Sequence, residues 1–245
     1  MTRLLRDYGL MLKWQALSSK TILPISLVVQ LMVAFGFVIG LGFLYPSITP
    51  GIAKFLTTGA PTISLLMVGL VVVPQLVSIS KTEGTFDYIW SLPVSRMVYV
   101  AADATIYVLI SIPGVVLSLI LGAAYYHFGL HISLLAIPAM LLIAMTGIFL
   151  GYSLAHSIAK AQITQLITQV LVFFIMIFSP VMFPTSQLPH WLSAVHKYLP
   201  IVYMADLSRG TLTDLNVNLG QAFAVVGAWC VAGLVLTCIL VRKRR

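Results

Sequence analysis

Long stretches without any charged residue dominate the chain. No Asp, Glu, Lys or Arg occurs in the ranges 21–53, 55–80, 104–159 and 215–241. A helix that crosses a bilayer needs about 20 mostly apolar residues, so the third of these ranges is long enough for two helices. The pattern therefore predicts six transmembrane helices, which we place at about 22–45, 61–79, 98–124, 133–155, 163–183 and 219–241.

Three further segments alternate apolar and polar residues at helical spacing. Residues 1–20 predict an amphipathic helix that lies on the membrane surface, and residues 80–97 predict a short helix between the second and third spans. Residues 184–210 predict a short re-entrant helical element before the last span. We expect an all-α membrane protein that forms a single transmembrane domain over residues 1–245.

Composition supports a membrane protein. The 245 residues are 60% hydrophobic and only 8% charged, whereas a soluble domain has about 25% charged residues. A chain of this composition lacks the polar surface that a soluble domain needs.

The distribution of basic residues predicts the orientation. Six spans place both termini on one side, and if that side is the cytoplasm, eleven of the fourteen Lys and Arg residues are cytoplasmic, as the positive-inside rule requires. The outside keeps Lys54, Lys197 and Arg209. The net charge of +8 is then explained by anionic lipid headgroups, and no nucleic-acid partner is needed.

The stretch from Ser80 to Arg96 is longer than a simple connection needs. Glu83 and Asp87 are four residues apart and would share a helix face, with Phe86 and Trp90 on the opposite face. The residues alone leave two interpretations open: an interfacial helix that anchors the loop, or a docking surface for a soluble partner.

Local signals suggest where this short helix begins and ends. Ser80 and Glu83 have the spacing of a capping box, and Thr85 is a second candidate cap. Gly84 is suited to a bend after the second span, and Pro93 should end the helix.

Two motifs together resemble type-2 ABC transporter permeases. The stretch "EGTFDYIWSLPVSR" (residues 83–96) is similar to the cytoplasmic coupling helix of that family. Residues 178–210 resemble the family's outer element, with the matching positions Phe183, Pro184, Leu188, Pro189, Trp191, Pro200, Tyr203 and Arg209.

The resemblance implies a permease subunit of an ATP-driven exporter in the bacterial plasma (inner) membrane. Its partners would be two copies of a cytosolic ATPase subunit, which bind ATP and Mg²⁺, and a second permease subunit that is identical or paralogous. This chain itself would hold no cofactor. The resemblance assigns ATPase docking to Glu83, Gly84, Thr85, Phe86, Asp87, Trp90 and Arg96.

Polar residues inside the predicted spans have two open interpretations. Amides and hydroxyls in a bilayer face either protein or a water-filled path. They therefore indicate either a substrate pathway or hydrogen bonds between helices, for Gln75, Ser78, Gln162, Gln165 and Gln169.

Asp103 and two glycine pairs also stand out within the spans. Asp103 suits either a local contact near Arg96 or proton coupling. The pairs Gly36–Gly40 and Gly147–Gly151 permit close helix approach, and we expect packing within the chain.

Enzymatic activity is not expected of this chain. It has no G-x-x-x-x-G-K-[ST] loop and no H-E-x-x-H motif, and we expect no metal site at His127 and His131. The alternative to an ABC permease is a self-sufficient secondary carrier or channel. For a permease, the substrate would be a drug, a lipid, a glycolipid or another amphipathic molecule.

Overall fold

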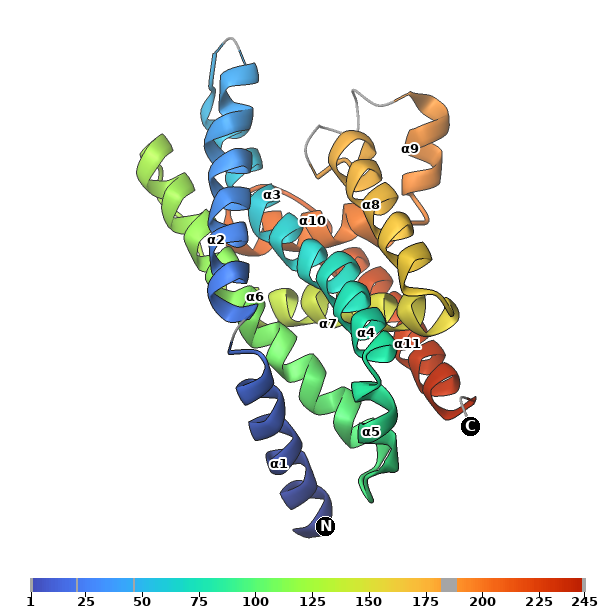
Figure 1. Cartoon of the computed structure of the whole chain (residues 1–245). Coiled ribbons are helices and arrows are strands. Elements are labelled where there is room, and N and C mark those ends of the chain that lie inside the picture. The colour runs from blue at the N-terminus through green and yellow to red at the C-terminus, as the bar shows by residue number, and fades with distance from the viewer. Residues whose placement is uncertain (1, 21, 46, 182–188, 244–245) are drawn as a thin grey trace.

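The computed structural model describes residues 2–20, 22–45, 47–181 and 189–243, and every regular element in these ranges is helical (Figure 1). The α-helices and the shorter π or 3-10 segments, labelled η, follow one another along the chain. They are α1 (Thr2–Ser18), α2 (Ile22–Phe35), η1 (Gly36–Gly40), η2 (Leu41–Leu44), α3 (Pro50–Met67), η3 (Val68–Val72), α4 (Val73–Thr82), α5 (Thr85–Ser91), α6 (Arg96–Tyr126), α7 (Ala136–Ser157), α8 (Ala161–Phe178), α9 (His190–His196), α10 (Pro200–Leu212) and α11 (Leu219–Lys243).

Five helical stretches in the described part of the chain are long and apolar enough to cross a membrane. They are Leu23–Phe43, Pro50–Thr82, Arg96–Tyr126, Ala136–Ser157 and Leu219–Lys243. The apolar part of α8, Ala161–Met176, is shorter than the other five. The prediction of an all-α, multi-pass membrane protein is confirmed, and the sixth span stays a prediction.

The second of these stretches begins eleven residues earlier than the predicted start at residue 61. The Thr49 hydroxyl accepts a hydrogen bond from the Ile52 backbone N–H at 3.4 Å and so caps the helix. Pro50 occupies the first turn, where a missing N–H costs nothing, and Pro61 lies inside the helix.

A glutamine from α2 forms hydrogen bonds with two backbone groups of α6 next to Pro113. The Gln30 amide donates to the Ile110 carbonyl at 2.7 Å, and its oxygen accepts from the Gly114 N–H at 2.7 Å. These two backbone groups are an i, i+4 pair, so the side chain is inserted into the hydrogen-bond ladder of the helix. The amide thus satisfies the polar groups that a proline break exposes inside an apolar environment.

Two glycines of α7 allow it to cross the second span closely. A Cβ at Gly69 would lie 2.7 Å from the Gly147 Cα, and a Cβ at Gly151 would clash with the Gly69 carbonyl oxygen. Packing within the chain is therefore confirmed for Gly147 and Gly151. The other predicted pair differs, because a Cβ at Gly36 or Gly40 would meet no described atom within 4 Å.

Buried apolar side chains form two clusters. One is built mainly from α3, α7, α10 and α11, and includes Ile63, Leu66, Ile143 and Met204. The other joins α4, α5, α6 and the end of α7, and includes Val77, Phe86, Tyr99 and Tyr152. The second cluster lies at the end of the molecule where α1 and α5 are found (Figure 1).

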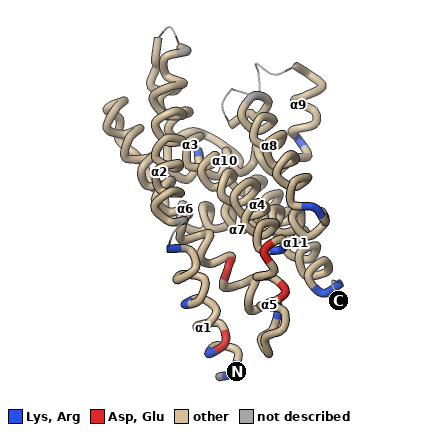
Figure 2. Tube along the Cα trace, viewed as in Figure 1, with Lys and Arg blue, Asp and Glu red and all other residues tan. Residues whose placement is uncertain are grey.

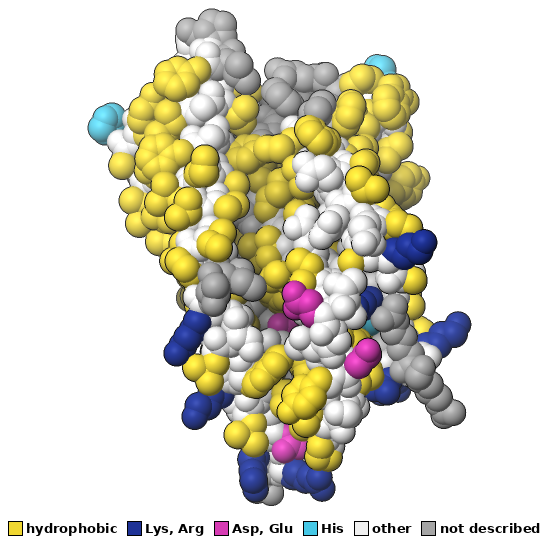
Figure 3. Space-filling model, in the orientation of Figure 1, with side chains coloured by type: hydrophobic (Ala, Val, Ile, Leu, Met, Phe, Trp, Pro, Cys, Tyr) yellow, Lys and Arg dark blue, Asp and Glu magenta, His cyan; other side chains and the backbone are white. Residues whose placement is uncertain are grey.

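Charged residues are unevenly distributed over the molecule. Figure 2 shows most Lys and Arg residues on the lower part, around α1, α5 and the C-terminus. Figure 3 shows hydrophobic side chains over the upper part of the same face, with basic and acidic side chains gathered below. This separation is what an apolar membrane-embedded surface with a polar end produces.

Candidate functional site

The connection between α4 and α5 is a sharp elbow at Gly84. The α4 helix ends at Glu83, whose N–H donates to the Ile79 carbonyl at 3.0 Å. Gly84 follows with φ +75°, a left-handed conformation that favours glycine, and α5 begins directly after it. The predicted bend at Gly84 is confirmed.

The predicted capping of this helix is wrong. Ser80 lies inside α4, so Ser80 and Glu83 form no capping box, and Thr85 is the first residue of α5 rather than its cap. The reason is that α4 continues past the predicted end at residue 79. Glu83 therefore does not share a helix with Asp87.

One face of α5 is buried in the protein. Phe86 and Ile89 are 3% and 5% exposed, and the Phe86 ring stacks on Trp90 with centroids 3.8 Å apart. Trp90 packs edge-on against Tyr99 of α6 at 5.6 Å, and the Arg96 guanidinium lies 5.4 Å from the Trp90 centroid. This aromatic packing fixes α5 firmly to α6.

The α4–α5 elbow also contacts α7, and the start of α6 contacts α11. Phe86 lies 5.4 Å from the His156 ring, and the Lys81 ammonium donates to the Ala155 carbonyl. Arg96 donates to the Val241 carbonyl of α11 at 3.0 Å. A force applied to α5 would therefore reach several helices.

The opposite edge of α5 is exposed. Asp87 lies at the surface of α5, and Glu83 and Gly84 are exposed before its start, so the acidic edge of α5 itself holds Asp87 and not the predicted pair. Tyr88, which the sequence reasoning did not single out, is 63% exposed. The sequence could have indicated this exposure, because Tyr88 follows Asp87 on the side of the helix that faces away from the buried Phe86 and Ile89.

The polar residues of the predicted pathway fall into two groups. The Gln75 amide donates to the Thr168 hydroxyl at 3.1 Å, joining α4 to α8, and Ser78 is buried. The glutamines on α8 are exposed on this chain; they are Gln162, Gln165 and Gln169. The structure thus brings Gln75 to α8 but not to the glutamine face of that helix.

Asp103 is buried in α6, where it is 4% exposed. The Tyr152 hydroxyl of α7 donates a hydrogen bond to its carboxylate. Sequence reasoning missed Tyr152, because the 49 residues that separate it from Asp103 include a whole loop.

The segment that resembles the family's outer element contains α9 and α10. Phe183 lies outside the described residues. Trp191 is 66% exposed, whereas His196 is buried and its ring nitrogen is 2.8 Å from the Phe178 carbonyl oxygen. The apolar and polar pattern of this helix predicts a buried Trp191 and an exposed His196, and the structure shows the reverse. The Tyr203 hydroxyl donates to the Lys197 carbonyl at 3.0 Å and holds α9 against α10.

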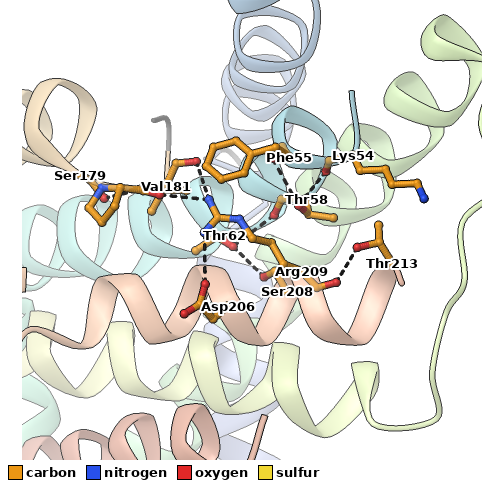
Figure 4. Close-up of polar contacts among 11 residues, drawn as sticks. Lys54, Phe55, Thr58, Thr62, Ser179, Val181, Asp206, Ser208, Arg209 and Thr213 are labelled. Carbon is orange, nitrogen blue, oxygen red and sulfur yellow. Dashed lines mark hydrogen bonds and ion pairs between the residues drawn. The ribbon is translucent and has the colours of Figure 1, made fainter. Parts of the chain in front are cut away.

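Arg209 joins α10 to the end of α8 and to α3 (Figure 4). Its guanidinium donates to the carbonyls of Pro180 and Val181 at 3.0 and 3.1 Å, and to the Asp206 carboxylate at 3.3 Å. The Arg209 guanidinium carbon lies over the face of the Phe55 ring, 3.8 Å from the ring centroid. Thr62 and Ser208 add a hydroxyl contact of 2.6 Å between α3 and α10.

Burial affects both charged groups of this contact. It lowers the pKa of Arg209 to about 10, so the guanidinium is still protonated at neutral pH. Burial also raises the pKa of Asp206, and the nearby Arg209 charge opposes this change. The arrangement is suited to holding a backbone turn in place rather than to chemistry on a substrate.

A family model described as "ABC-2 type transporter" matches residues 4–213. A comparison with curated proteins gave no match. The matched range runs from α1 to the end of α10 and contains both the α4–α5 elbow and the Arg209 contact. The chain therefore belongs to the ABC-2 type transporter family and is a membrane permease component.

Proposed function

We propose that this chain is the membrane-spanning permease subunit of an ATP-driven exporter in a bacterial plasma membrane. In this proposal α8 is the sixth span and both termini are cytoplasmic. The gathering of Lys and Arg around α1, α5 and the C-terminus supports this orientation (Figure 2). The cargo would be a drug, lipid, glycolipid or other amphipathic molecule.

In this proposal the energy comes from separate ATPase subunits. The sequence has no P-loop motif with which to hold nucleotide phosphates. Two cytosolic ATPase subunits would bind ATP and Mg²⁺, and a second permease subunit, identical or paralogous, would complete the pathway. The exposed glutamines on α8 are positions at which that second subunit would find polar partners.

The observation that carries the proposal is the construction of α5. Its outer edge offers Asp87 and Tyr88 to solvent, while Phe86 and Trp90 bind it to α6 and α7. A helix that is exposed on one edge and packed against other helices on the other edge can pass the motion of a bound partner to those helices. A partner that pushes on the exposed edge would move the membrane helices.

Charge reversal at the elbow tests this proposal. The permease is co-expressed with its ATPase subunit, and the double variant Glu83→Lys, Asp87→Lys is purified in detergent. We expect ATPase retention to fall at least about tenfold, because both acidic side chains are exposed, Glu83 at the end of α4 and Asp87 on α5. Transport in reconstituted vesicles should fall with it.

A matched control is Asp214→Lys, which reverses another exposed acid far along the chain. It should retain the ATPase as wild type does. Full transport by the double variant would remove the docking role of α5. Transport by this chain in vesicles without any ATPase would instead identify a self-sufficient carrier or channel.

A further inference from the structure

A polar cavity opens between α1, α4 and α6, at the end of the molecule that holds both termini. Its volume is about 460 Å³, which is within the range of small-molecule sites. The residues that matter for its chemistry are Trp14, Gln15, Glu83, Tyr99, Asp103 and Tyr107. Its walls come from segments that are far apart in the sequence.

The charge of this cavity is acidic. Asp103 and Glu83 line it, and the described lining includes no Lys, Arg or His. Asp103 is 4% exposed, and the Tyr152 hydroxyl donates to one of its carboxylate oxygens. An ionised carboxylate buried within a membrane helix requires an opposite charge or several donors, and among the described residues Tyr152 supplies one neutral hydrogen bond.

Aromatic side chains line the same cavity as this acid. Trp14 comes from α1, and Tyr99 and Tyr107 lie one turn before and one turn after Asp103 on α6. Aromatic faces attract cations, and Trp does so most strongly. The apolar side chains of Leu76 and Val77 form part of the α4 wall. An acid, aromatic rings and an apolar wall together suit a bulky organic cation.

We propose that this cavity binds a cationic amphiphile, with its ammonium or other onium group beside Asp103. The inference rests on the proposed function, because it names the class of molecule that the permease would receive. Glu83 and Thr85 flank the α4–α5 elbow and also line the cavity. A movement of α5 would therefore change the shape of the binding site.

The test measures binding to the purified full chain in a non-ionic detergent, without any ATPase. Isothermal titration calorimetry is done with tetraphenylphosphonium and, separately, with tetraphenylborate, which has a similar shape and the opposite charge. Titrations into protein-free micelles provide the blank. We expect saturable binding of the cation and at least about tenfold weaker binding of the anion.

Variants locate the bound cation. Asp103→Asn keeps an oxygen that accepts the Tyr152 hydrogen bond but removes the charge, and should weaken cation binding at least about tenfold. Asp7→Asn makes the same change on α1, outside the cavity lining, and should bind as wild type does. Size-exclusion chromatography checks that each variant is folded.

If Asp103→Asn does not fold, Glu83→Gln and Trp14→Leu replace it, and each should weaken cation binding several-fold. Equal binding of the two ions, or unchanged binding in every cavity variant, would overturn the proposal. Because no ATPase is present, loss of coupling in the charge-reversal experiment leaves this measurement unaffected. Glu83 belongs to both proposals, so ATPase retention, which is measured without any cargo, is the readout that separates failure of docking from failure of cation binding.

Discussion

At the scale of single residues, Arg209 is the clearest case of a buried charge that is paired. It is 6% exposed, yet its guanidinium donates to two carbonyls and a carboxylate and lies against an aromatic ring. The carbonyls belong to Pro180 and Val181, at the turn that follows α8. Without the guanidinium these oxygens would be left without a donor in an apolar environment.

Replacement of Arg209 by Met should therefore destabilise the protein strongly. We expect the free energy of unfolding to fall by about 2–5 kcal/mol, because several buried partners lose a charge-assisted hydrogen bond. The measurement is denaturant unfolding of the purified protein in detergent.

The matched control is Lys54→Met, which breaks an exposed ion pair with Asp214. Exposed pairs of this kind contribute about 0–1 kcal/mol, so this variant should be close to wild type. Similar losses in the two variants would show that Arg209 does not hold the α8–α10 turn.

The sequence pointed to Arg209 only through the resemblance of residues 178–210 to a family pattern. Its partners could not be predicted, because the two carbonyls are 28 and 29 residues away and belong to a turn with no distinctive side chain. Trp191 and His196 show the same limit. Their segment is helical, but which of its faces is buried depends on which neighbour covers it.

At the scale of elements, the crossing of the second span with α7 depends on glycine. Gly69 and Gly147 bring two backbones together, and Gly151 lies against the Gly69 carbonyl. Both contacts are with backbone atoms, which cannot move aside as a flexible side chain does. The helices must separate to admit a methyl group.

Substitution of Gly69 by Ala should destabilise the protein by about 1–3 kcal/mol, because its Cβ would lie 2.7 Å from the Gly147 Cα and 2.8 Å from the Ile148 nitrogen. The thermal midpoint of the detergent-solubilised protein is measured. Gly36→Ala provides the control, since its Cβ would meet no described atom within 4 Å and should leave the midpoint unchanged. Equal midpoints for both variants would contradict the close crossing.

Element ends were harder to predict than element types. The apolar runs located α6, α7 and α11 because length and hydropathy suffice for a helix in a bilayer. The start at Pro50 and the end at Thr82 depend on a cap and on contacts with other helices, and neither is visible in an apolar pattern. Glu83, which was predicted to belong to the short helix, therefore caps the end of α4, although the bend at Gly84 was predicted.

At the scale of the whole molecule, sites form where segments distant in sequence meet. Asp103 was visible as an unusual acid in a span, but the aromatic wall that Trp14 contributes comes from α1, almost ninety residues earlier. The exposed edge of α5 lies within one short segment and needs no distant partner to form. The residues of one short segment can be predicted to lie together from the sequence, whereas this cavity depends on how α1, α4 and α6 pack.

The placement of α8 as a sixth span makes a definite prediction about the sides of the membrane. With both termini cytoplasmic, Asp87 faces the cytosol and Asp214 faces the outside, and both are exposed. The single substitutions Asp87→Cys and Asp214→Cys are made in a Cys230→Ser, Cys238→Ser background, because both natural cysteines are free thiols. In intact cells a membrane-impermeant maleimide should label the variant at 214 and not the one at 87, and disrupted cells should label both. Labelling of both in intact cells, or of 87 alone, would mean that the number of spans or the orientation is different, and α5 could then not receive a cytosolic partner.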